Sequence, residues 1–226
     1  MRASGVILAA GRGERFQGQV NKVFVLLHGR PLLRWCVDVF PASGVVGELV
    51  VVARPGEEGR ITELLSEVPL PVQVVPGGKR RQDSARAGIE AARGEYVLVH
   101  DAARPLVSPE LIRRVLKATE EHGAAVPVFP VVDTVRYVDE RGFLRPEDVP
   151  RAGLVRIQTP QGFRRELLLS ALEHAERQGL PLTDDASAVL ALGKPVAAVP
   201  GDPRNLKITH PEDLALAESL LPGQYA

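Results

Sequence analysis

Short apolar runs rich in β-branched residues alternate along the chain with longer amphipathic stretches. The apolar runs lie at 6–8, 49–53, 72–75, 96–100, 125–129 and 196–199, and the amphipathic stretches at about 31–40, 57–67, 80–92, 108–121, 164–178 and 210–221. Continuous apolar strands that alternate with helices are typical of a mostly parallel sheet with helices on both faces. We therefore predict a Rossmann-like α/β fold, with ligands bound beyond the carboxyl ends of the strands.

Two helix starts can be identified from capping residues. Ser108 is followed by Pro109 and Glu110, which is typical of an N-cap with proline in the first turn. Thr209 precedes Glu212 by three residues, which predicts a capping box for the last helix.

The helical pattern stops between about 132 and 158. Two extended pieces flank the turn at 139–142, and a third extended piece covers 154–158. An excursion of this length from an α/β core is more often a functional arm than a passive connection. We predict an extended β-arm here.

Charge and cysteine content narrow the classes of partner. Lys plus Arg and Asp plus Glu each number 28, so no net field draws the chain to nucleic acid or to a membrane, and any anionic ligand depends on local cations. The single cysteine, Cys36, excludes an internal disulfide and is expected to be a buried, inert thiol. The first apolar stretch is too short for a signal peptide and no run approaches a membrane span, so we expect a cytoplasmic protein.

A small-residue loop follows the first strand, and two cations follow the loop. Residues Ala9 to Gly13 carry almost no side chains, which lets backbone N–H groups approach a phosphate, and Arg15 and Lys22 come next. Phe16 stands where a dinucleotide fingerprint needs its third glycine, and no Walker A lysine is present. The loop indicates a nucleoside triphosphate site, although an ordinary strand-to-helix turn remains the alternative.

Two further segments at strand ends carry polar groups, and we expect them to converge with the first loop at one edge of the sheet. Gly77 and Gly78, with Ser84 one helical turn later, could read the edge of a base, or they could form only a turn before a solvated helix. Asp101 follows an apolar strand, where a carboxylate can hold Mg²⁺ beside phosphates or simply cap a turn. Arg104 could pair with Asp101, and we interpret His100 as a structural histidine of the strand.

Polar groups also occur in three separate later segments. They are Asp133 with Thr134, then Arg151 with Thr159, and Thr183 with Asp184, Asp185 and Ser187, of which Thr183 or Asp184 could be only a helix cap. Lys207 lies between apolar neighbours in what we predict to be a short strand, where it needs a partner such as a phosphate.

Taken in order, these segments resemble one enzyme family. The motifs are L-A-A-G-x-G-x-R-F, Lys22, G-G-x-x-R-x-x-S, V-H-D-A-A-R-P, D-T, T-P-Q, T-D-D-A-S and N-L-K-I-T-x-P-E-D-L. The chain resembles the 2-C-methyl-D-erythritol 4-phosphate cytidylyltransferases from Val6 to about Leu221, most specifically in V-H-D-A-A-R-P and T-D-D-A-S.

The resemblance implies one nucleotidyltransferase domain over residues 1–226. Its reaction joins CTP to methylerythritol phosphate, a phosphorylated polyol, and gives CDP-methylerythritol and pyrophosphate with Mg²⁺. The implied catalytic residues are Arg15, Lys22, Arg151 and Lys207; the nucleotide-binding residues are Ala9, Ala10, Gly11, Gly13, Gly77, Gly78, Ser84, Asp101 and Ala102; the acceptor-binding residues are Arg104, Thr134, Arg151, Thr159, Thr183 and Lys207; and Asp101 lies beside the metal.

The resemblance further implies a homodimer. The arm at about 132–158 would reach into a partner subunit, so that Thr134 and Arg151 serve the neighbour's site. Two positions depart from the family pattern: Asn21 replaces the usual proline before Lys22, and Gly162 replaces an aromatic that we expect at the pocket wall. Two alternatives stay open, a ribitol 5-phosphate cytidylyltransferase and a nucleotide-sensing module without turnover.

Overall fold

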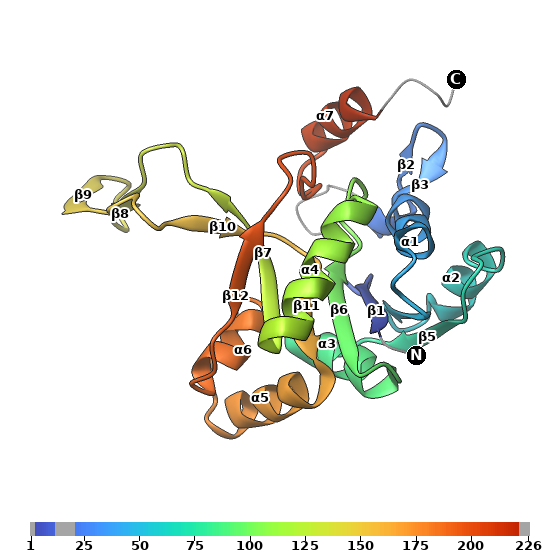
Figure 1. The fold of residues 1–226 in the computed structure, drawn as a ribbon. Coiled ribbons are helices and arrows are strands. Elements are labelled where there is room, and N and C mark those ends of the chain that lie inside the picture. The colour runs from blue at the N-terminus through green and yellow to red at the C-terminus, as the bar shows by residue number, and fades with distance from the viewer. Residues whose placement is uncertain (1–2, 12–20, 222–226) are drawn as a thin grey trace.

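The computed structural model in Figure 1 describes residues 3–11 and 21–221. The sheet strands are β1 (Ala3–Leu8), β4 (Glu48–Ala53), β5 (Val72–Pro76), β6 (Tyr96–Asp101), β7 (Ala124–Pro130), β10 (Val155–Ile157), β11 (Gln161–Arg164) and β12 (Ala197–Pro200). The helices are α1 (Leu32–Ser43), α2 (Glu58–Leu64), α3 (Arg81–Ala91), α4 (Pro109–His122), α5 (Arg165–Arg177), α6 (Asp185–Ala191) and α7 (Glu212–Leu220). The predicted strand–helix alternation is confirmed, and α2 ends three residues before the predicted limit.

The strands form one mixed sheet in the order β10-β7-β11-β6-β1-β4-β5, with β12 paired to β7. β6, β1, β4 and β5 run parallel, and β12 runs parallel to β7. Two strands are antiparallel. β11 lies between β6 and β7 and pairs with the start of β7, at Ala124 and Ala125. β10 pairs with the end of β7, from Val128 to Pro130, along the same edge as β11. The predicted mostly parallel sheet is therefore confirmed, with two short strands reversed.

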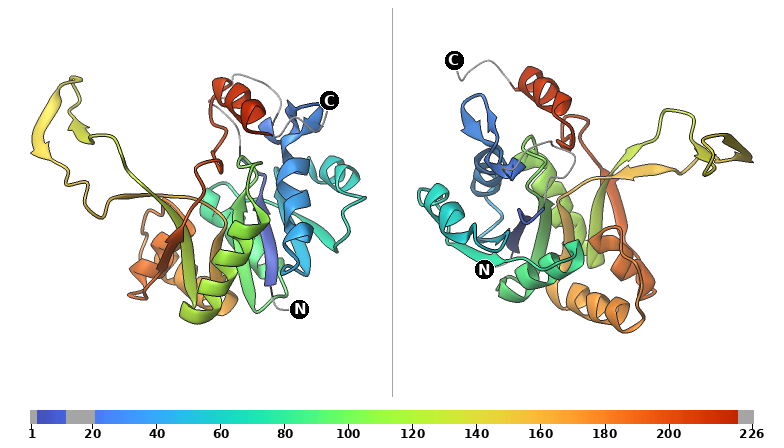
Figure 2. Two further views of the ribbon diagram at one scale, coloured as in Figure 1. Left: turned by 45° about the horizontal axis from the view of Figure 1, so that its top comes forward. Right: turned by 180° about the vertical axis from the view of Figure 1, so that it is seen from behind.

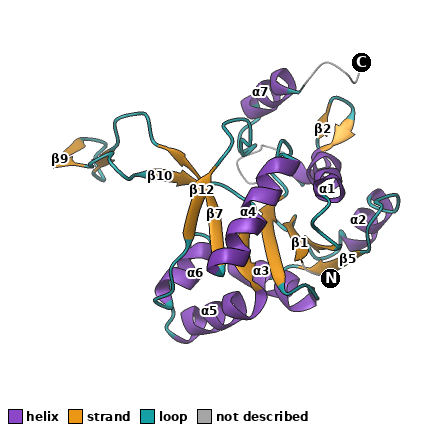
Figure 3. Ribbon diagram, in the orientation of Figure 1, coloured by secondary structure: helices purple, strands orange, loops and turns teal. Residues whose placement is uncertain are grey.

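Helices cover both faces of the sheet, as Figure 3 shows. α1, α2 and α4 pack on one face, and α3, α5 and α6 pack on the other. Neighbouring strand residues are buried against opposite layers, with Val6 facing α3 and Ile7 facing α1 and α4. This two-sided burial explains why the strands read as continuous apolar runs rather than as alternating ones.

The two predicted helix starts have different outcomes. Ser108 caps α4, because its Oγ accepts from the backbone N–H of Leu111 at 3.2 Å. The capping box predicted for the last helix is wrong. Asp213 accepts from the backbone N–H groups of Thr209 and His210 at 2.7 and 2.8 Å. The carboxylate that caps this helix start is therefore that of Asp213 and not that of Glu212.

The arm lies outside the main sheet, as both views in Figure 2 show. Its two strands, β8 (Arg136–Val138) and β9 (Leu144–Asp148), pair antiparallel around a turn that Gly142 closes with φ of 84°. The predicted pair of extended pieces is confirmed. Five of its apolar side chains are more than half exposed: Val132, Tyr137, Val138, Phe143 and Leu144. Such a set on one projecting ribbon indicates a surface that another molecule covers.

The expectation for Cys36 is also confirmed. The thiol is fully buried in α1, and burial raises its pKa, so it is held as the neutral form. A hairpin of β2 (Leu26–Leu27) and β3 (Arg30–Pro31) follows the short 3-10 turn Lys22–Phe24. Among residues 3–11 and 21–221, no helix combines the length and apolar character needed to cross a membrane.

Gly162 lies in β11 beneath α4, so the expectation that it affects a pocket wall is wrong. A Cβ built at this position would lie 2.1 Å from Thr119 Oγ1 and 2.9 Å from Val115 Cγ1. Thr119 is buried and its hydroxyl donates to the Val115 carbonyl, so it has no free direction in which to move. An aromatic here would need α4 to lie farther from the sheet.

We predict that Gly162→Ala lowers the free energy of unfolding by about 1–3 kcal/mol, because the added methyl overpacks the helix–sheet contact. Gly59→Ala is the matched control. It lies in α2, where an added Cβ would meet no atom within 4 Å, and should be neutral or slightly stabilising. Urea denaturation of both variants measures the difference; equal stabilities would contradict the packing account.

Candidate active site

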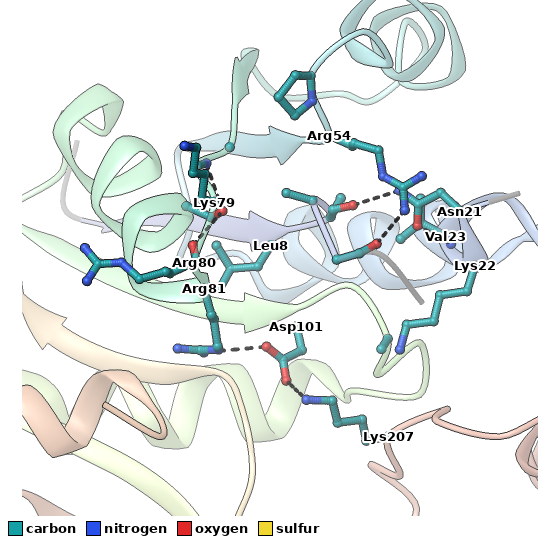
Figure 4. A pocket seen from close by; sticks show the side chains of 18 of the residues that line it. Leu8, Asn21, Lys22, Val23, Arg54, Lys79, Arg80, Arg81, Asp101 and Lys207 are labelled. Carbon is teal, nitrogen blue, oxygen red and sulfur yellow. Dashed lines mark hydrogen bonds and ion pairs between the residues drawn. The ribbon is translucent and has the colours of Figure 1, made fainter. Parts of the chain in front are cut away.

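A cavity of about 870 Å³ opens at the carboxyl ends of β1, β4, β5 and β6. Its lining combines backbone of the small-residue loops with several lysine and arginine side chains, among them Lys22, Arg81 and Lys207 in Figure 4. The lining residues are Leu8, Ala9, Ala10, Gly11, Asn21, Lys22, Val23, Arg54, Pro55, Gly77, Gly78, Lys79, Arg80, Arg81, Ser84, Asp101, Ala103, Lys207 and Thr209. The predicted convergence of the three strand ends is confirmed, as the parallel strands require.

The first loop of the cavity leaves β1 at Leu8. The backbone N–H of Ala9 donates to Val52 O at 2.8 Å, which fixes the start of the loop against β4. Ala10 and Gly11 then line the cavity with backbone and a single methyl group. The predicted residues Gly13 and Arg15 lie outside the described residues.

The second loop packs directly against the first. A Cβ at Gly77 would lie 2.6 Å from the Cβ of Ala10 and 2.8 Å from Ser84 Oγ, so only glycine allows this approach. Ser84 Oγ accepts from the N–H of Gly78 at 3.1 Å and donates to Arg80 O at 3.3 Å. Ser84 is buried, and its hydroxyl stabilises the turn at Gly77 and Gly78. Its contact with a base stays a prediction.

Asp101 ends β6 at the floor of the cavity, between two cations (Figure 4). Its carboxylate accepts from Lys207 Nζ at 2.7 Å and lies 3.6 Å from a guanidinium nitrogen of Arg81. Burial alone would raise the pKa of the Asp101 carboxyl, but Lys207 and Arg81 outweigh it and hold that pKa well below its usual range. Asp101 is therefore a fixed anion at every working pH.

His100 and Thr159 support Asp101 from behind. Thr159 Oγ1 accepts from the backbone N–H of Asp101 at 3.1 Å and lies 2.9 Å from His100 Nδ1. His100 Nε2 lies 3.1 Å from the carbonyl of Arg104, and burial lowers the pKa of His100 to about 4. The imidazole is therefore neutral and hydrogen-bonded, as the structural interpretation predicts.

Two neighbours of Asp101 in sequence point elsewhere. Arg104 does not line the cavity, and its Nη1 donates to the carbonyl of Asn205 at 2.8 Å. The predicted pairing of Arg104 with Asp101 is wrong as a direct contact, because Lys207 and Arg81 take the carboxylate oxygens. Ala102 is buried, and its N–H donates to Leu8 O at 3.2 Å, which joins the ends of β6 and β1.

Lys22 and Lys207 come together at one rim of the cavity. Lys22 Nζ donates to the carbonyl of Ile208 at 3.0 Å, next to Lys207 in sequence. Lys207 lies in a loop and is half exposed, so the prediction that it occupies a short strand is wrong. Its predicted need for an anionic partner is met by Asp101.

Arg81 is the main cavity residue for which the sequence predicted no role. It stands within the motif G-G-x-x-R-x-x-S, and its guanidinium bridges Asp101 to Asp185, at 2.8 Å from the latter. Burial would lower the pKa of Arg81, but these two carboxylates raise it above its ordinary value. The motif itself was the available signal, since an arginine at the first turn of α3 faces the same cavity as Ser84.

Of the predicted acceptor-binding residues only Lys207 lines the cavity: Arg104 and Thr159 pack behind Asp101, and three others lie farther away. Thr134 and Arg151 are exposed on the arm, where Arg151 donates to Val132 O at 2.6 Å. Thr183 is exposed beside α6, and its hydroxyl lies 3.0 Å from Ser187 Oγ; the N-cap of α6 is Asp184. The described chain thus brings together the nucleotide side of the predicted site but not its full acceptor side.

A metal in this cavity would depend on Asp101. Within the described parts of the chain, no group of three or more His, Cys, Asp and Glu side chains could hold a metal ion. A single ionised carboxylate is nevertheless enough where phosphate oxygens complete the coordination of Mg²⁺. Asp101 fits that role, because its carboxylate is anionic and borders the cavity.

Comparison with known proteins places this geometry in a family. A family model described as 2-C-methyl-D-erythritol 4-phosphate cytidylyltransferase matches residues 4–222. A protein of that name from Geobacillus thermodenitrificans is 39% identical over 229 residues, which cover 100% of both chains. One from Frankia casuarinae is 43% identical and covers 97% of this chain and 81% of the relative.

Solved structures agree with the sequence matches. The crystal structure of 2-C-methyl-D-erythritol 4-phosphate cytidylyltransferase from Thermus thermophilus superposes with a TM-score of 0.82 at 42% identity, covering 97% of this chain and 98% of that one. The corresponding synthase from Anaerococcus prevotii gives a TM-score of 0.84 at 27% identity, covering 96% and 97%. This chain therefore belongs to the 2-C-methyl-D-erythritol 4-phosphate cytidylyltransferase family.

Proposed function

We propose that this nucleotidyltransferase transfers the cytidylyl group of CTP to 2-C-methyl-D-erythritol 4-phosphate, with release of pyrophosphate. The observation that carries the proposal is the gathering of Lys22, Lys207 and Arg81 at a cavity walled by glycine loops. The reaction belongs to the biosynthesis of isoprenoid precursors. We also place the enzyme in the cytoplasm, in line with the expectation from its apolar runs.

The chemistry requires charge control more than proton transfer. An oxygen of the acceptor phosphate attacks the α-phosphorus of CTP, and the bond to the pyrophosphate oxygen breaks. The nucleophile is already an anion at neutral pH, so no general base is needed, and the neutral, buried His100 is not placed to act as one. Repulsion between two anions is the main obstacle, which fixed cations reduce.

Lys22 and Lys207 divide this task in the proposal. Lys22 stabilises the charge that builds on the α-phosphate, together with Arg15 as the family resemblance implies. Lys207 leaves Asp101 to hold the acceptor phosphate. Asp101 would hold Mg²⁺ with the phosphate oxygens, and the ion would supply neutralisation of their charge. The backbone around Ala10, Gly77 and Gly78 would surround the cytidine, with Ser84 behind it.

The arm completes the acceptor side from a second subunit. Thr134 and Arg151 are exposed and outside the cavity, while the family pattern assigns them to acceptor binding. Both statements hold together if the arm enters the neighbouring subunit's site in a homodimer. The exposed apolar side chains of the arm support the same proposal, because a partner would bury them.

The proposed reaction is tested by a coupled pyrophosphate assay with purified protein, CTP and Mg²⁺. We expect pyrophosphate release with methylerythritol phosphate and far slower release with ribitol 5-phosphate. Faster turnover of ribitol 5-phosphate would replace the acceptor, and CTP binding without pyrophosphate release with either acceptor would favour the sensing module.

We predict that Lys22→Ala lowers kcat at least about a hundredfold, because the variant loses one contact to the charge that develops in the transition state. Thermal unfolding of the variant should stay close to that of the wild type. Lys117→Ala removes an exposed lysine of α4 that does not line the cavity, and it serves as the control. Near-normal turnover of Lys22→Ala would refute the assignment of Lys22.

We predict that two inactive variants restore each other if the arm acts on its neighbour. Arg151→Ala and Lys207→Ala should each lose activity as homodimers. When they are co-expressed, random pairing leaves intact sites in the mixed dimers and restores about a quarter of wild-type activity per subunit. Activity no higher than that of the separate variants would mean that each arm serves its own subunit.

A further inference from the structure

A closed ring of contacts joins residues 9–11 of the small-residue loop after β1, called the glycine loop below, to the loop between β4 and α2. Asn21 Nδ2 donates to Ala9 O at 3.0 Å and to Glu57 Oε2 at 2.7 Å. The other carboxylate oxygen of Glu57 lies 3.8 Å from Arg54 Nη1, and Arg54 Nη2 donates to Gly11 O at 3.2 Å. Asn21 and Arg54 therefore hold the carbonyls of Ala9 and Gly11, and Glu57 links the two side chains to each other.

Asn21 is the residue on which this ring depends. Its side chain is buried at 1% exposure, and both its amide N–H donors and its oxygen are used, the oxygen accepting from Val23 N at 3.4 Å. Aspartate would offer no donor to Ala9 O and would place a second carboxylate beside Glu57. The proline usual in the family has no side-chain donor at all, so the ring depends on the departure found in this chain.

The same contacts fix Lys22, the residue next to Asn21. Asn21 caps the 3-10 turn that begins at Lys22, and the turn ends at Phe24, whose ring lies 3.7 Å beneath the guanidinium of Arg60 in α2. At its other end, Lys22 Nζ is held by Ile208 O. The lysine is thus anchored at its backbone by the β4–α2 segment and at its ammonium group by the loop that carries Lys207.

The ring also sets the direction of a backbone donor. In a trans peptide group the C=O of one residue and the N–H of the next point in opposite directions. The bond from Asn21 to Ala9 O therefore fixes where the N–H of Ala10 points, and Ala10 lines the cavity. One buried amide side chain orients both a backbone donor and a cation of the same site.

We infer that Asn21 is a positioning residue for the transfer step: with Glu57 and Arg54 it holds the glycine loop and Lys22 in the arrangement that receives the nucleotide phosphates. The inference rests on the proposed function, in which Lys22 stabilises the charge on the α-phosphate. Asn21 acts through Lys22 and the loop backbone and contacts no substrate itself. Misplacement of a catalytic group by about 1 Å can cost about a hundredfold in rate, so a buried tie of this kind is a determinant of kcat.

A double-mutant cycle tests whether Asn21 acts through Lys22. We expect Asn21→Ala to lower kcat about tenfold or more, with a smaller change in KM for CTP. In a Lys22→Ala background the same substitution should lower kcat by a clearly smaller factor, because one of the two groups that it positions is gone and only the loop backbone remains. An equal loss of kcat in both backgrounds would overturn the inference.

Glu57→Ala provides a second variant that leaves Asn21 in place, and Glu63→Ala is its control. Glu63 is an exposed carboxylate of the adjoining helix α2 and lies outside the ring. We expect Glu57→Ala to lower kcat, the effect to be less than additive with Asn21→Ala, and Glu63→Ala to retain wild-type kcat. A full additive loss, or a loss of the same size in Glu63→Ala, would overturn the ring.

Hydrogen exchange separates this inference from the proposed function. The amide of Val23 donates to the side chain of Asn21, so it loses its acceptor in Asn21→Ala and should exchange faster than in wild type. The amide of Phe24 donates to the backbone carbonyl of Asn21 and should exchange faster as well, because the turn loses its cap. Unchanged exchange rates would refute the claim that Asn21 holds this turn, whatever the activity of the variant. If wild-type protein releases no pyrophosphate, the proposed function and the positioning role fail together, and the exchange measurement still decides whether Asn21 holds this backbone.

Discussion

The ion pair between Asp101 and Lys207 joins the end of β6 to a loop that lies 106 residues later in the chain. It closes the floor of the cavity and brings the 207–209 loop against Lys22 through the carbonyl of Ile208. Without a substrate, Asp101 is the anion that Lys207 and Arg81 share. Arg81 is also paired with Asp185, so these four groups balance one another. The net positive charge that a polyphosphate requires comes from further cations of the cavity lining, such as Lys22 and Lys79.

This arrangement explains why the cavity is built from short side chains and long cations. The parallel strands β1, β4, β5 and β6 bring their loops to one edge, and close contact between Gly77 and Ala10 leaves room for a ligand against the backbone. The cations then reach in from α3, the 3-10 turn and the 207–209 loop. The backbone of the loops therefore determines the shape of the cavity, and α3, the 3-10 turn and the 207–209 loop provide cationic side chains.

The sequence predicted the nucleotide side better than the acceptor side, for a physical reason. Apolar periodicity and glycine loops are local signals, so the sheet, the helix layers and the convergence of the three loops could be predicted. The partner of Asp101 is set by tertiary packing, and the sequence favoured Arg104, which is near in the chain, over Lys207 and Arg81. The strand β11 and its close contact at Gly162 were missed because four residues between a proline and a helix show no period.

The acceptor side also could not be read from one chain, because the cavity within the described residues lacks part of it. Arg151 and Thr134 lie on an arm whose apolar residues face solvent, and neither borders the cavity. A two-phosphate reaction needs cations on both phosphates, and a single fold supplies them most easily around the first. In the proposed homodimer, the arm of one subunit would supply the remaining cation to its neighbour's site, so the acceptor side would depend on assembly. Bound donor and acceptor anions would then be neutralised together only in the assembled pair, because a single subunit would lack part of the acceptor side.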